Sequence, residues 1–494
     1  MTGVRKALVL SFVERWLGIV ISLGSNVLLA RLLTPGQIGI FSVSLSVIGI
    51  AQVLRDFGVV SFLIQEKELT ESHIRTAFGI SLLMGLSVFA LLFAVAPWIS
   101  QFYQEPLVLT TVRICALNFL LLPFCTVSMA LLRREMAFKA LAVVGLAGGS
   151  AGAAVSVAMA WAGFGVVSLA VGAVTANIVT GFGSWVARSE RRVLRPALTE
   201  WRRLLRFGTL SSVTGVVTSM SMDMNDLAVG KVMGFDSVAV ISKAQGLMNL
   251  FHRDVMMAIR NVAFPAFAKS AREGVNLESS YLTSLNHVTA VAWTFYGFVS
   301  LYALETVRLL FGAQWDAAAP LVPWYCLVGA VAASANLIGP LLLAAGRIDL
   351  LTKVELLWQP FRALLIVVAA VWFQSMLACA VASLVAVVIQ VPMLYRAKAG
   401  FQPTDWPVLR RDVGRSAAAA LLSLLLPTGI VAFCGFGRFE PIPALWFGTA
   451  IATCIVGWVV ALLVLRHPMI CDPVFQRCIS IFLTAWRRIR RNRN

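Results

Sequence analysis

Ionisable side chains within long apolar runs are the residues of this 494-residue chain that could do chemistry. A charge in the hydrocarbon core of a membrane costs about 2.5–3.5 kcal/mol, so such residues usually face protein or water. Cations outnumber acids here, which predicts a positively charged, water-filled path that receives an anionic group. The cations are Arg15, Arg55, Arg113, Lys243, Arg253, Arg260 and Arg362, and the acids are Glu14, Asp56, Asp223, Asp226 and Asp254.

These charges have different expected roles. Arginine suits phosphate because its planar fork makes two parallel hydrogen bonds. Arg260 is expected to cap the end of its helix, and the lone His287 is interpreted as an ordinary helix residue. The predicted anion-binding cleft is made of Arg15, Arg55, Arg113, Lys243, Arg253 and Arg362. The candidates for carrying coupling protons or sodium, or for gating, are Glu14, Asp56, Asp223, Asp226 and Asp254.

Two adjacent charge pairs leave two interpretations open. Arg55-Asp56 and Arg253-Asp254 lie near the same end of their predicted helices. Each pair is either an inner gate or a pair whose long side chains reach the membrane interface.

The sequence carries no motif for catalysis, nucleotide binding or metal binding. G-x-x-x-x-G-K-[ST], H-E-x-x-H and G-x-S-x-G do not occur. The eight cysteines lie mostly within apolar runs and never as C-x-x-C, which predicts buried small residues rather than ligands or disulfides. We therefore expect a transporter and not an enzyme, with no catalytic residue, metal or cofactor, driven by an ion gradient or a coupled lipid pool.

The composition indicates a protein that crosses a membrane many times. Hydrophobic residues make up 59% of the chain and charged residues 13%, whereas soluble domains are about 25% charged. Apolar runs long enough to span about 30 Å of hydrocarbon predict an all-α integral membrane protein. The fourteen expected helices cover residues 7–30, 37–62, 75–97, 107–132, 140–162, 165–187, 204–230, 237–264, 281–305, 318–345, 351–373, 376–396, 413–434 and 442–465.

Lysine and arginine alternate strongly between the two sides of these helices. Thirty lie on the side of the termini, counting those within three residues of a helix end, and four lie on the opposite side. Positive charge marks the cytoplasmic side, so both termini are expected in the cytoplasm. The same distribution explains the net charge of +18 without a nucleic-acid partner.

The spacing of polar gaps divides the helices into six, six and two. A 200-residue shift places Ala30-Arg31 over Gly230-Lys231, which indicates two parallel repeats with a substrate cleft between them. The expected parts are an N-lobe (1–190), a basic cytoplasmic linker (191–206), a C-lobe (207–397), two extra helices (398–468) and an amphipathic basic tail (469–494). The linker and the tail are expected to contact anionic membrane lipids.

Several segments resemble one family of membrane proteins. Residues 28–41, LLARLLTPGQIGIF, look like the opening segment of polysaccharide exporters. Asp56-Phe57-Gly58, Leu131-Leu132-Arg133-Arg134 and the stretch from Asp226 to Gly234 resemble further family segments. Together they resemble the polysaccharide transporter (Wzx-like) branch of the multidrug/oligosaccharidyl-lipid/polysaccharide (MOP) superfamily. Val240-Ile241-Ser242 departs from the family pattern at the predicted turn between helices 7 and 8.

The resemblance implies a fold and a function. The fold is two six-helix bundles plus two extra helices. The activity is flipping of an undecaprenyl-diphosphate-linked oligosaccharide across the bacterial inner membrane, for exopolysaccharide, capsule or O-antigen synthesis. The implied partners are that lipid-linked substrate, membrane lipids and the polymerase and chain-length proteins of the same pathway.

Two other functions remain as alternatives. A cation-coupled multidrug exporter of the same superfamily would favour an acidic, aromatic cleft over a cationic one. A membrane glycosyltransferase or polymerase would need a large outer loop with catalytic residues, and the longest outer loop here runs only from Glu305 to Pro320.

Overall fold

The computed structural model describes residues 2–56, 59–66, 69–188, 195–199, 201, 219–221, 223–273, 276–435 and 441–471. Over these residues the regular structure is helical and contains no strand. The prediction of an all-α protein is therefore confirmed. Most of the predicted basic linker (191–206) and nearly all of the predicted basic tail (469–494) lie outside the described residues.

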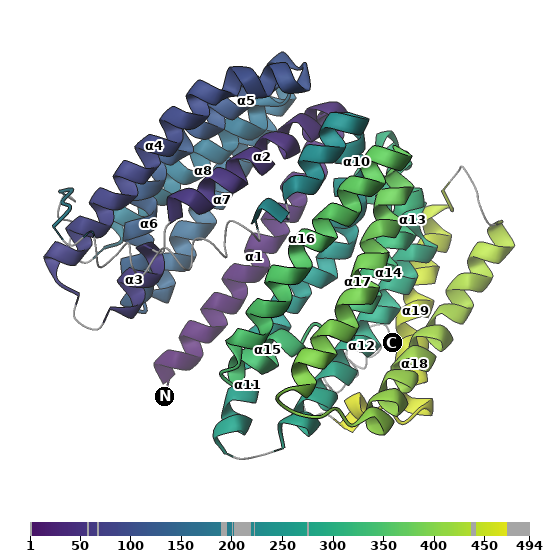
Figure 1. Cartoon of the computed structure of the whole chain (residues 1–494). Coiled ribbons are helices and arrows are strands. Elements are labelled where there is room, and N and C mark those ends of the chain that lie inside the picture. Colours follow the sequence, from purple (N-terminus) through teal and green to yellow (C-terminus); the bar gives the residue numbers. More distant parts are fainter. Residues whose placement is uncertain are drawn as a thin grey trace, which may run out of the picture. The chain divides into compact units, whose positions relative to one another are not determined.

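The chain divides into two compact units, and each is described by itself. Unit 1 comprises residues 1–241, 310–314 and 359–379. An unlabelled helix over 223–233 also belongs to it. Its labelled helices from the first half of the chain are α1 (Thr2–Leu32), α2 (Pro35–Asp56), α3 (Val59–Gln65), α4 (Glu71–Tyr103), α5 (Pro106–Ala116), α6 (Asn118–Arg134), α7 (Phe138–Trp161) and α8 (Val167–Val186) (Figure 1).

Unit 2 comprises residues 242–309, 315–358 and 380–494. One long helical stretch there is interrupted by a π-helical turn, η1 (Leu250–Val255), between α10 (Phe235–Asn249), which begins in unit 1, and α11 (Met256–Arg272). The elements that follow are α12 (Leu277–Leu301), α13 (Ala303–Leu310), η2 (Ala313–Leu321), α14 (Val322–Ala333), α15 (Ile338–Ala344), α16 (Ile348–Phe373), α17 (Met376–Ala399), α18 (Trp406–Cys434), α19 (Ala444–Val464) and η3 (Pro468–Cys471). Residues 310–314 and 359–379 of these elements and their connections belong to unit 1.

Ten helical segments within the described residues are long and apolar enough to cross a membrane, or up to eleven if the bent pair α12 and α13 counts as one span. Three of the fourteen expected helices are not among them. Residues 7–30 contribute only the shorter apolar helix Leu17–Leu32, and 204–230 lies largely outside the described residues. The helix over 237–264 does not qualify, and it contains Lys243, Arg253, Asp254 and Arg260. The multi-pass class is confirmed, whereas the count of fourteen and the boundaries of the lobes stay predictions.

Glycines allow α7 and α8 to lie side by side in unit 1 (Figure 1). A Cβ atom at Gly148 would lie 2.1 Å from the Thr180 hydroxyl, and one at Gly172 would lie 1.8 Å from the Ser156 hydroxyl. Lipid tails are as apolar as leucine, so membrane helices associate through close packing rather than through the hydrophobic effect. The glycine spacing of α7 therefore has a structural role.

A second close approach joins α2 to the start of α10. A Cβ atom at Gly39 would lie 1.9 Å from the Phe235 carbonyl oxygen. Nearby in unit 1, the Tyr103 hydroxyl donates to the Leu227 carbonyl at 3.0 Å, and the Lys231 ammonium donates to the Phe102 carbonyl. These contacts attach the segment over 223–236 to α2 and to the end of α4.

Part of the predicted linker lies along α4. The Ala197 amide donates to the Arg75 carbonyl at 3.1 Å, and Ser72 and Thr199 share a hydrogen bond of 3.0 Å between their hydroxyls. A Cβ atom at Gly79 would lie 2.2 Å from the Ala197 carbonyl oxygen. Residues 195–199 are therefore fixed to the beginning of α4 by hydrogen bonds and close packing.

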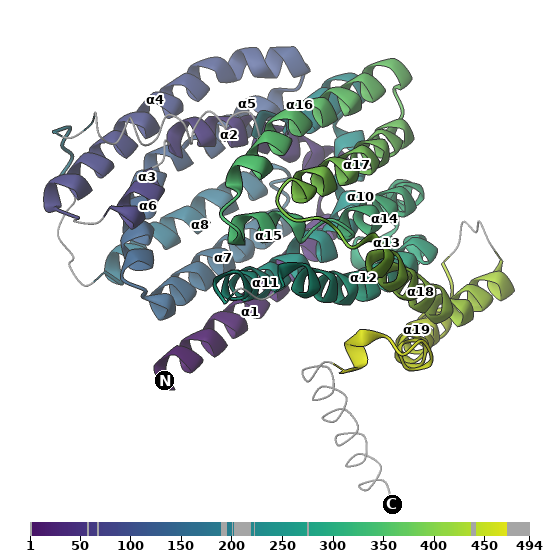
Figure 2. The ribbon, with the colours of Figure 1, turned by 60° about the horizontal axis from the view of Figure 1, so that its bottom comes forward.

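A buried polar network joins α12, α18 and the segment after α19 in unit 2; α18 and α19 run side by side (Figure 2). The Met469 amide donates to Nδ1 of His467 at 3.3 Å, which assigns the imidazole proton to Nε2. Nε2 lies 3.2 Å from the Ser416 hydroxyl, which donates to Oδ1 of Asn286 at 2.8 Å. His467 is only 1% exposed, so this network fixes the end of α19 against α12 and α18.

A buried ion pair joins the beginning of α12 to the end of α17. The Lys398 ammonium is fully buried, contacts the Glu278 carboxylate and donates to the Thr404 hydroxyl at 3.0 Å. The second carboxylate oxygen of Glu278 accepts from the Asp405 amide at 3.3 Å. The Lys398 ammonium also lies 4.9 Å from the centre of the Tyr281 ring. Both charges are thus satisfied, as buried ions must be.

Gly39→Ala tests the close approach in unit 1. The new Cβ would collide with the Phe235 carbonyl, so we expect a loss of several kcal/mol, typical of severe overpacking. The measurement is the thermal unfolding midpoint in detergent. Gly24→Ala, with open space around its Cβ, is the matched control and should leave the midpoint unchanged or slightly raised. Equal midpoints for the two variants would contradict the packing.

Glu278→Gln tests the buried ion pair. The substitution leaves the Lys398 ammonium buried without its carboxylate, and breaking a buried pair in this way typically costs about 3–5 kcal/mol. Adding Lys398→Met removes the stranded charge, so the double variant should recover a large part of the lost stability. A double-mutant cycle on detergent unfolding midpoints measures both effects. Additive losses would show that the two groups do not interact.

The unfolding stability should fall as the pH drops through the range set by His467. Burial is the main reason why the pKa of His467 falls from 6.5 to about 4, and His287 lowers it further. Arg415 acts in the same direction as His287 and Asp412 in the opposite one. Above pH 6.5 the imidazole is neutral in both states. Between pH 6.5 and 4 only the unfolded state gains the proton, so about 3 kcal/mol of stability is lost.

The test of this pH dependence is the unfolding midpoint of the wild type and of His467→Gln at pH 7.5 and 4.5. Glutamine does not titrate, so the drop on acidification should be smaller in the variant. A variant that loses as much as the wild type would assign the pH dependence to other groups.

Candidate functional site

Arg55 lies near the end of α2 inside the helix packing of unit 1. Its side chain is 3% exposed, and Nη1 donates to the Thr126 hydroxyl of α6 at 2.8 Å. This contact holds α2 against α6. The side chains of Glu14, Arg15 and Asp56 lie outside the described residues, although their backbones continue α1 and α2.

Arg113 is a half-buried cation of unit 1 that has few partners among the described residues. It lies on α5, half-buried, with its guanidinium carbon 4.4 Å from the centre of the Phe93 ring of α4. Within the described residues no hydrogen bond or ion pair joins the guanidinium to another group, and Nε is buried. It lies seven positions after Pro106, the first residue of this membrane-spanning segment, which is about 10 Å along a helix. A half-buried guanidinium thus retains donors for an anion.

The acids over 223–226 lie beside α2. The Ser219 hydroxyl donates to Oδ2 of Asp223 at 2.9 Å, and a Cβ atom at Gly49 would lie 2.8 Å from the same oxygen. Asp226 is on the same helix, half-buried, and Oδ1 of Asn225 between them is buried without a donor from the described residues. This face offers acceptors for a cation or a proton. No group of three or more His, Cys, Asp or Glu in the described part could hold a metal ion.

The remaining predicted cations differ from one another in burial and in their partners. Lys243 of α10 is 7% exposed, with its ammonium 5.2 Å from the centre of the Trp315 ring. Arg253 and Asp254 lie in the π-helical turn η1 and pair with each other at 2.9 Å, with the arginine side chain 66% exposed. Arg362 lies half-buried on α16.

The expectation that Arg260 caps the end of its helix is wrong, because α11 continues to Arg272. Nη2 of Arg260 donates to Oδ1 of Asn336 at 3.0 Å, and the amide nitrogen of Asn336 lies 3.4 Å from Nδ1 of His252. Asn336 is in the break between α14 and α15, so the π-helical turn and the broken helix are joined by polar side chains. Isolated π turns are frequent at functional sites.

The predicted charges are therefore distributed over both units. Arg55, Arg113 and Arg362 belong to unit 1 together with Asp223 and Asp226, and the remaining described charges belong to unit 2. A common cationic cleft remains a prediction. Sequence reasoning missed the pair of Glu278 and Lys398, because it placed both residues in polar gaps, where charge is usual and burial carries no sequence signal.

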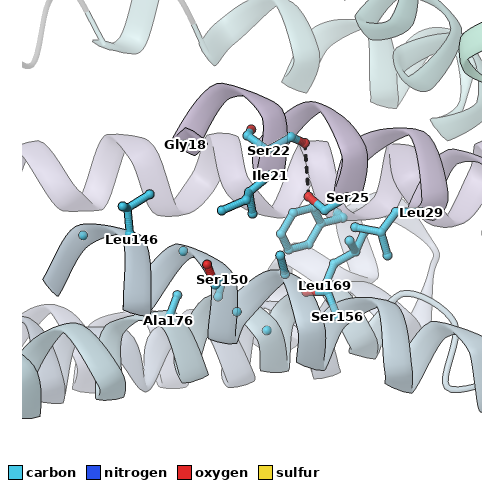
Figure 3. Close-up of a pocket in the computed structure, with 17 residues that line it drawn as sticks. Gly18, Ile21, Ser22, Ser25, Leu29, Leu146, Ser150, Ser156, Leu169 and Ala176 are labelled. Atoms are coloured by element: carbon cyan, nitrogen blue, oxygen red, sulfur yellow. Dashed lines mark hydrogen bonds between the residues drawn. The ribbon is translucent and has the colours of Figure 1, made fainter. Parts of the chain in front are cut away.

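A cavity of about 330 Å³ opens between three helices of unit 1 (Figure 3). Gly18, Ile21, Ser22, Ser25 and Leu29 of α1 form one wall, and the middle of α7 forms the opposite wall. Figure 3 shows the Ser25 hydroxyl bonded to the Ser22 carbonyl, at 3.1 Å, above the side chains of α7. The rest of the lining is Phe41, Gly145, Leu146, Gly149, Ser150, Gly152, Ala153, Ser156, Leu169, Gly172, Ala173 and Ala176.

The cavity is lined by small and apolar residues and carries no charge. A Cβ atom at Gly18 or at Gly149 would meet nothing within 4 Å, so these two glycines face open space. Ser156 is 7% exposed, and no hydrogen bond joins its hydroxyl to another described residue. Nothing in the sequence indicates that one side of the small-residue face of α7 is hollow.

Comparison with known proteins places the chain among polysaccharide biosynthesis proteins. A family model described as "Polysaccharide biosynthesis protein" matches residues 28–320. The lipopolysaccharide biosynthesis protein WzxC of Escherichia coli (strain K12) is 25% identical over 345 residues, which cover 68% of this chain and 69% of the relative. The teichuronic acid biosynthesis protein TuaB of Bacillus subtilis (strain 168) is 24% identical over 314 residues, which cover 61% of this chain and 62% of the relative.

Solved structures share the fold. The lipid II flippase MurJ, in an inward closed conformation, aligns with a TM-score of 0.74 at 13% identity, covering 94% of this chain and 99% of that chain. A multidrug resistance MATE family transporter of the MOP superfamily, in an inward-facing conformation, aligns with a TM-score of 0.60 at 15% identity, covering 79% of this chain and 98% of that chain. The predicted resemblance to polysaccharide transporters of the MOP superfamily is confirmed. With more than half of its length matched by the family model, the chain belongs to the family of polysaccharide biosynthesis proteins.

Proposed function

We propose that this protein is a transporter that moves a polyprenyl-diphosphate-linked oligosaccharide from the cytoplasmic to the outer leaflet of the bacterial inner membrane. The observation that carries the proposal is the guanidinium of Arg113, which lies within a membrane-spanning segment and has no hydrogen-bond or ion-pair partner among the described residues. Membership of a polysaccharide biosynthesis family and similarity to WzxC support the class of substrate.

A diphosphate fits the donors that Arg113 retains. No described residue accepts a hydrogen bond from this guanidinium, so an anion at its accessible nitrogens would add charge-assisted hydrogen bonds of about 1.5–3 kcal/mol each. Guanidinium and phosphate form charge-assisted, often bidentate hydrogen bonds. Phe93 covers one face of the guanidinium through a cation–π contact and leaves its edge for the ligand.

The other predicted charges extend this proposal. Arg15, Arg55, Lys243, Arg253 and Arg362 would complete a cationic path for the headgroup. The acids Glu14, Asp56, Asp223, Asp226 and Asp254 would carry the coupling ion or gate the path, because the sequence contains no nucleotide-binding motif. Alternating exposure of one cleft by two lobes, with both termini in the cytoplasm, is the transport mechanism that we infer. Polymerase and chain-length proteins of the pathway would use the delivered product.

A cation-coupled drug exporter is the second candidate. Its support is the acceptor-rich face of Asp223 and Asn225 and the MATE-like fold. An organic cation bound at Arg113 would meet a like charge, which is unfavourable at this depth, so the donors of Arg113 favour an anion. We therefore favour the anionic lipid-linked substrate.

Replacing Arg113 by glutamine tests the anion site. Charge-assisted hydrogen bonds contribute about 1.5–3 kcal/mol, so translocation of a fluorescent polyprenyl-diphosphate oligosaccharide in proteoliposomes should fall about tenfold or more. Arg113→Lys keeps the charge but loses the fork, so it should retain an intermediate rate. Arg347→Gln, at an arginine that pairs with the exposed Asp349, is the matched control and should not change the rate.

The amount of inserted protein is measured by immunoblot for each variant. Wild-type translocation in Arg113→Gln, at equal protein, would remove the anion site. Drug efflux that falls with Asp223→Asn while lipid translocation is absent from the wild type would favour the drug exporter.

A further inference from the structure

We propose that the cavity between α1, α7 and α8 holds a segment of the polyprenyl chain of the transported lipid. This inference rests on the proposed function, because the polyprenyl chain is part of the same lipid whose diphosphate Arg113 would bind. The cavity and Arg113 both belong to unit 1.

The cavity lies at the depth where hydrocarbon is available. Its α7 wall runs from Gly145 to Ser156, the middle of a 24-residue membrane-spanning helix. These residues extend for about 17 Å along the helix, within the roughly 30 Å of a hydrocarbon core. An occupant that enters from the membrane at this depth is therefore a hydrocarbon chain rather than a hydrated group.

The walls are shaped to leave room for a chain. Protein interiors are close-packed, and voids larger than a water molecule are few. Here Gly18 of α1 and Gly149 of α7 face open space, whereas Gly152 of α7 and Gly172 of α8 lie in the close contact between those two helices. The same small-residue helix thus packs tightly on one side and leaves a hollow on the other. An elongated apolar ligand fills that hollow without displacing a helix.

The hydroxyl groups favour a polyprenyl chain over a saturated acyl chain. Ser150 lines the cavity, and its hydroxyl makes no hydrogen bond with another described residue (Figure 3). The double bonds that recur along a polyprenyl chain present π electrons, which accept weak hydrogen bonds, and a saturated chain presents none. Ser22 adds a further hydroxyl to the lining.

The energetics indicate what such a site would do. A lipid chain is already in an apolar solvent, so entering the cavity gives little hydrophobic free energy and gains mainly dispersion contacts. The chain site therefore selects and orients the lipid, while the headgroup site supplies most of the affinity. Filling the cavity should weaken binding of a long-chain substrate and leave the headgroup site intact.

Photolabelling of the full-length protein in lipid nanodiscs tests the site. The probe is a polyprenyl diphosphate with a diazirine within its chain, and labelled peptides are identified by mass spectrometry. We expect labels on residues 18–29 and 145–156 in the wild type. Gly149→Leu and Gly18→Leu, which fill the cavity from opposite walls, should each lower this labelling about tenfold.

Gly429→Leu is the matched control. Gly429 is also a glycine of a membrane-spanning helix, α18, and its Cβ would meet nothing within 4 Å. This variant should label as the wild type does. The unfolding midpoint of each variant identifies any that fails to fold, and the two filling variants provide independent readings.

Two further arms separate the alternatives. A phosphatidylethanolamine with a diazirine in a saturated acyl chain should label the cavity weakly, and labelling equal to that by the polyprenyl probe would overturn the assignment to the substrate chain. Farnesyl diphosphate carries the same headgroup on a short chain and should bind the wild type and Gly149→Leu equally. Unchanged polyprenyl labelling in both filling variants would overturn the inference about the cavity. If farnesyl diphosphate still binds the wild type in that case, the proposed function is not contradicted. Absence of farnesyl diphosphate binding to the wild type would count against the proposed function itself.

Discussion

Helix association inside hydrocarbon is the constraint on which the rest of this structure depends. The hydrophobic effect cannot hold membrane helices together, because the surrounding lipid is as apolar as their side chains. Close backbone approach replaces it, at Gly39 against Phe235 and at Gly172 against Ser156. These contacts fix α2 and α8, and they thereby determine which helix faces are left to receive ligands. The hollow beside α1 exists because α7 uses one side of its small-residue face for α8.

The same solvent imposes a second constraint on charge. Each ionised group at depth needs a partner, and the described groups meet this need in different ways. Arg55 donates to a threonine hydroxyl, Lys243 lies over an indole ring, and Lys398 contacts a carboxylate. Arg113 has only an aromatic ring on one face. The hydrogen-bond donors of this guanidinium have no acceptor among the described residues. A ligand explains such an arginine better than packing does, since a leucine would pack against Phe93 without the free-energy cost of desolvating a charge.

The fold class followed from the sequence because hydrophobic length and charge asymmetry are properties of single segments. The basic linker was recognisable from the sequence in the same way. The pairing of Glu278 with Lys398 was not, since it joins residues 120 positions apart that both look like loop residues. The π-helical turn at His252 was also invisible, because helical periodicity does not record an extra residue in one turn. Arg113 was identified as a candidate from its depth, but only the contacts distinguish it from Arg55, which is bonded within the bundle.

In the function that we propose, two features of unit 1 divide the recognition of a lipid-linked substrate. An anionic headgroup would gain free energy at Arg113, because charge-assisted hydrogen bonds are strong where water is scarce. A chain gains almost none by leaving lipid for an apolar cavity of about 330 Å³, so that cavity can discriminate by shape without holding the substrate tightly. Weak chain binding suits a transporter, because a tail bound as firmly as the headgroup would slow release on the far side. The tight packing of α7 against α8, next to an open cavity beside α1, is therefore consistent with a substrate that is first selected and then released.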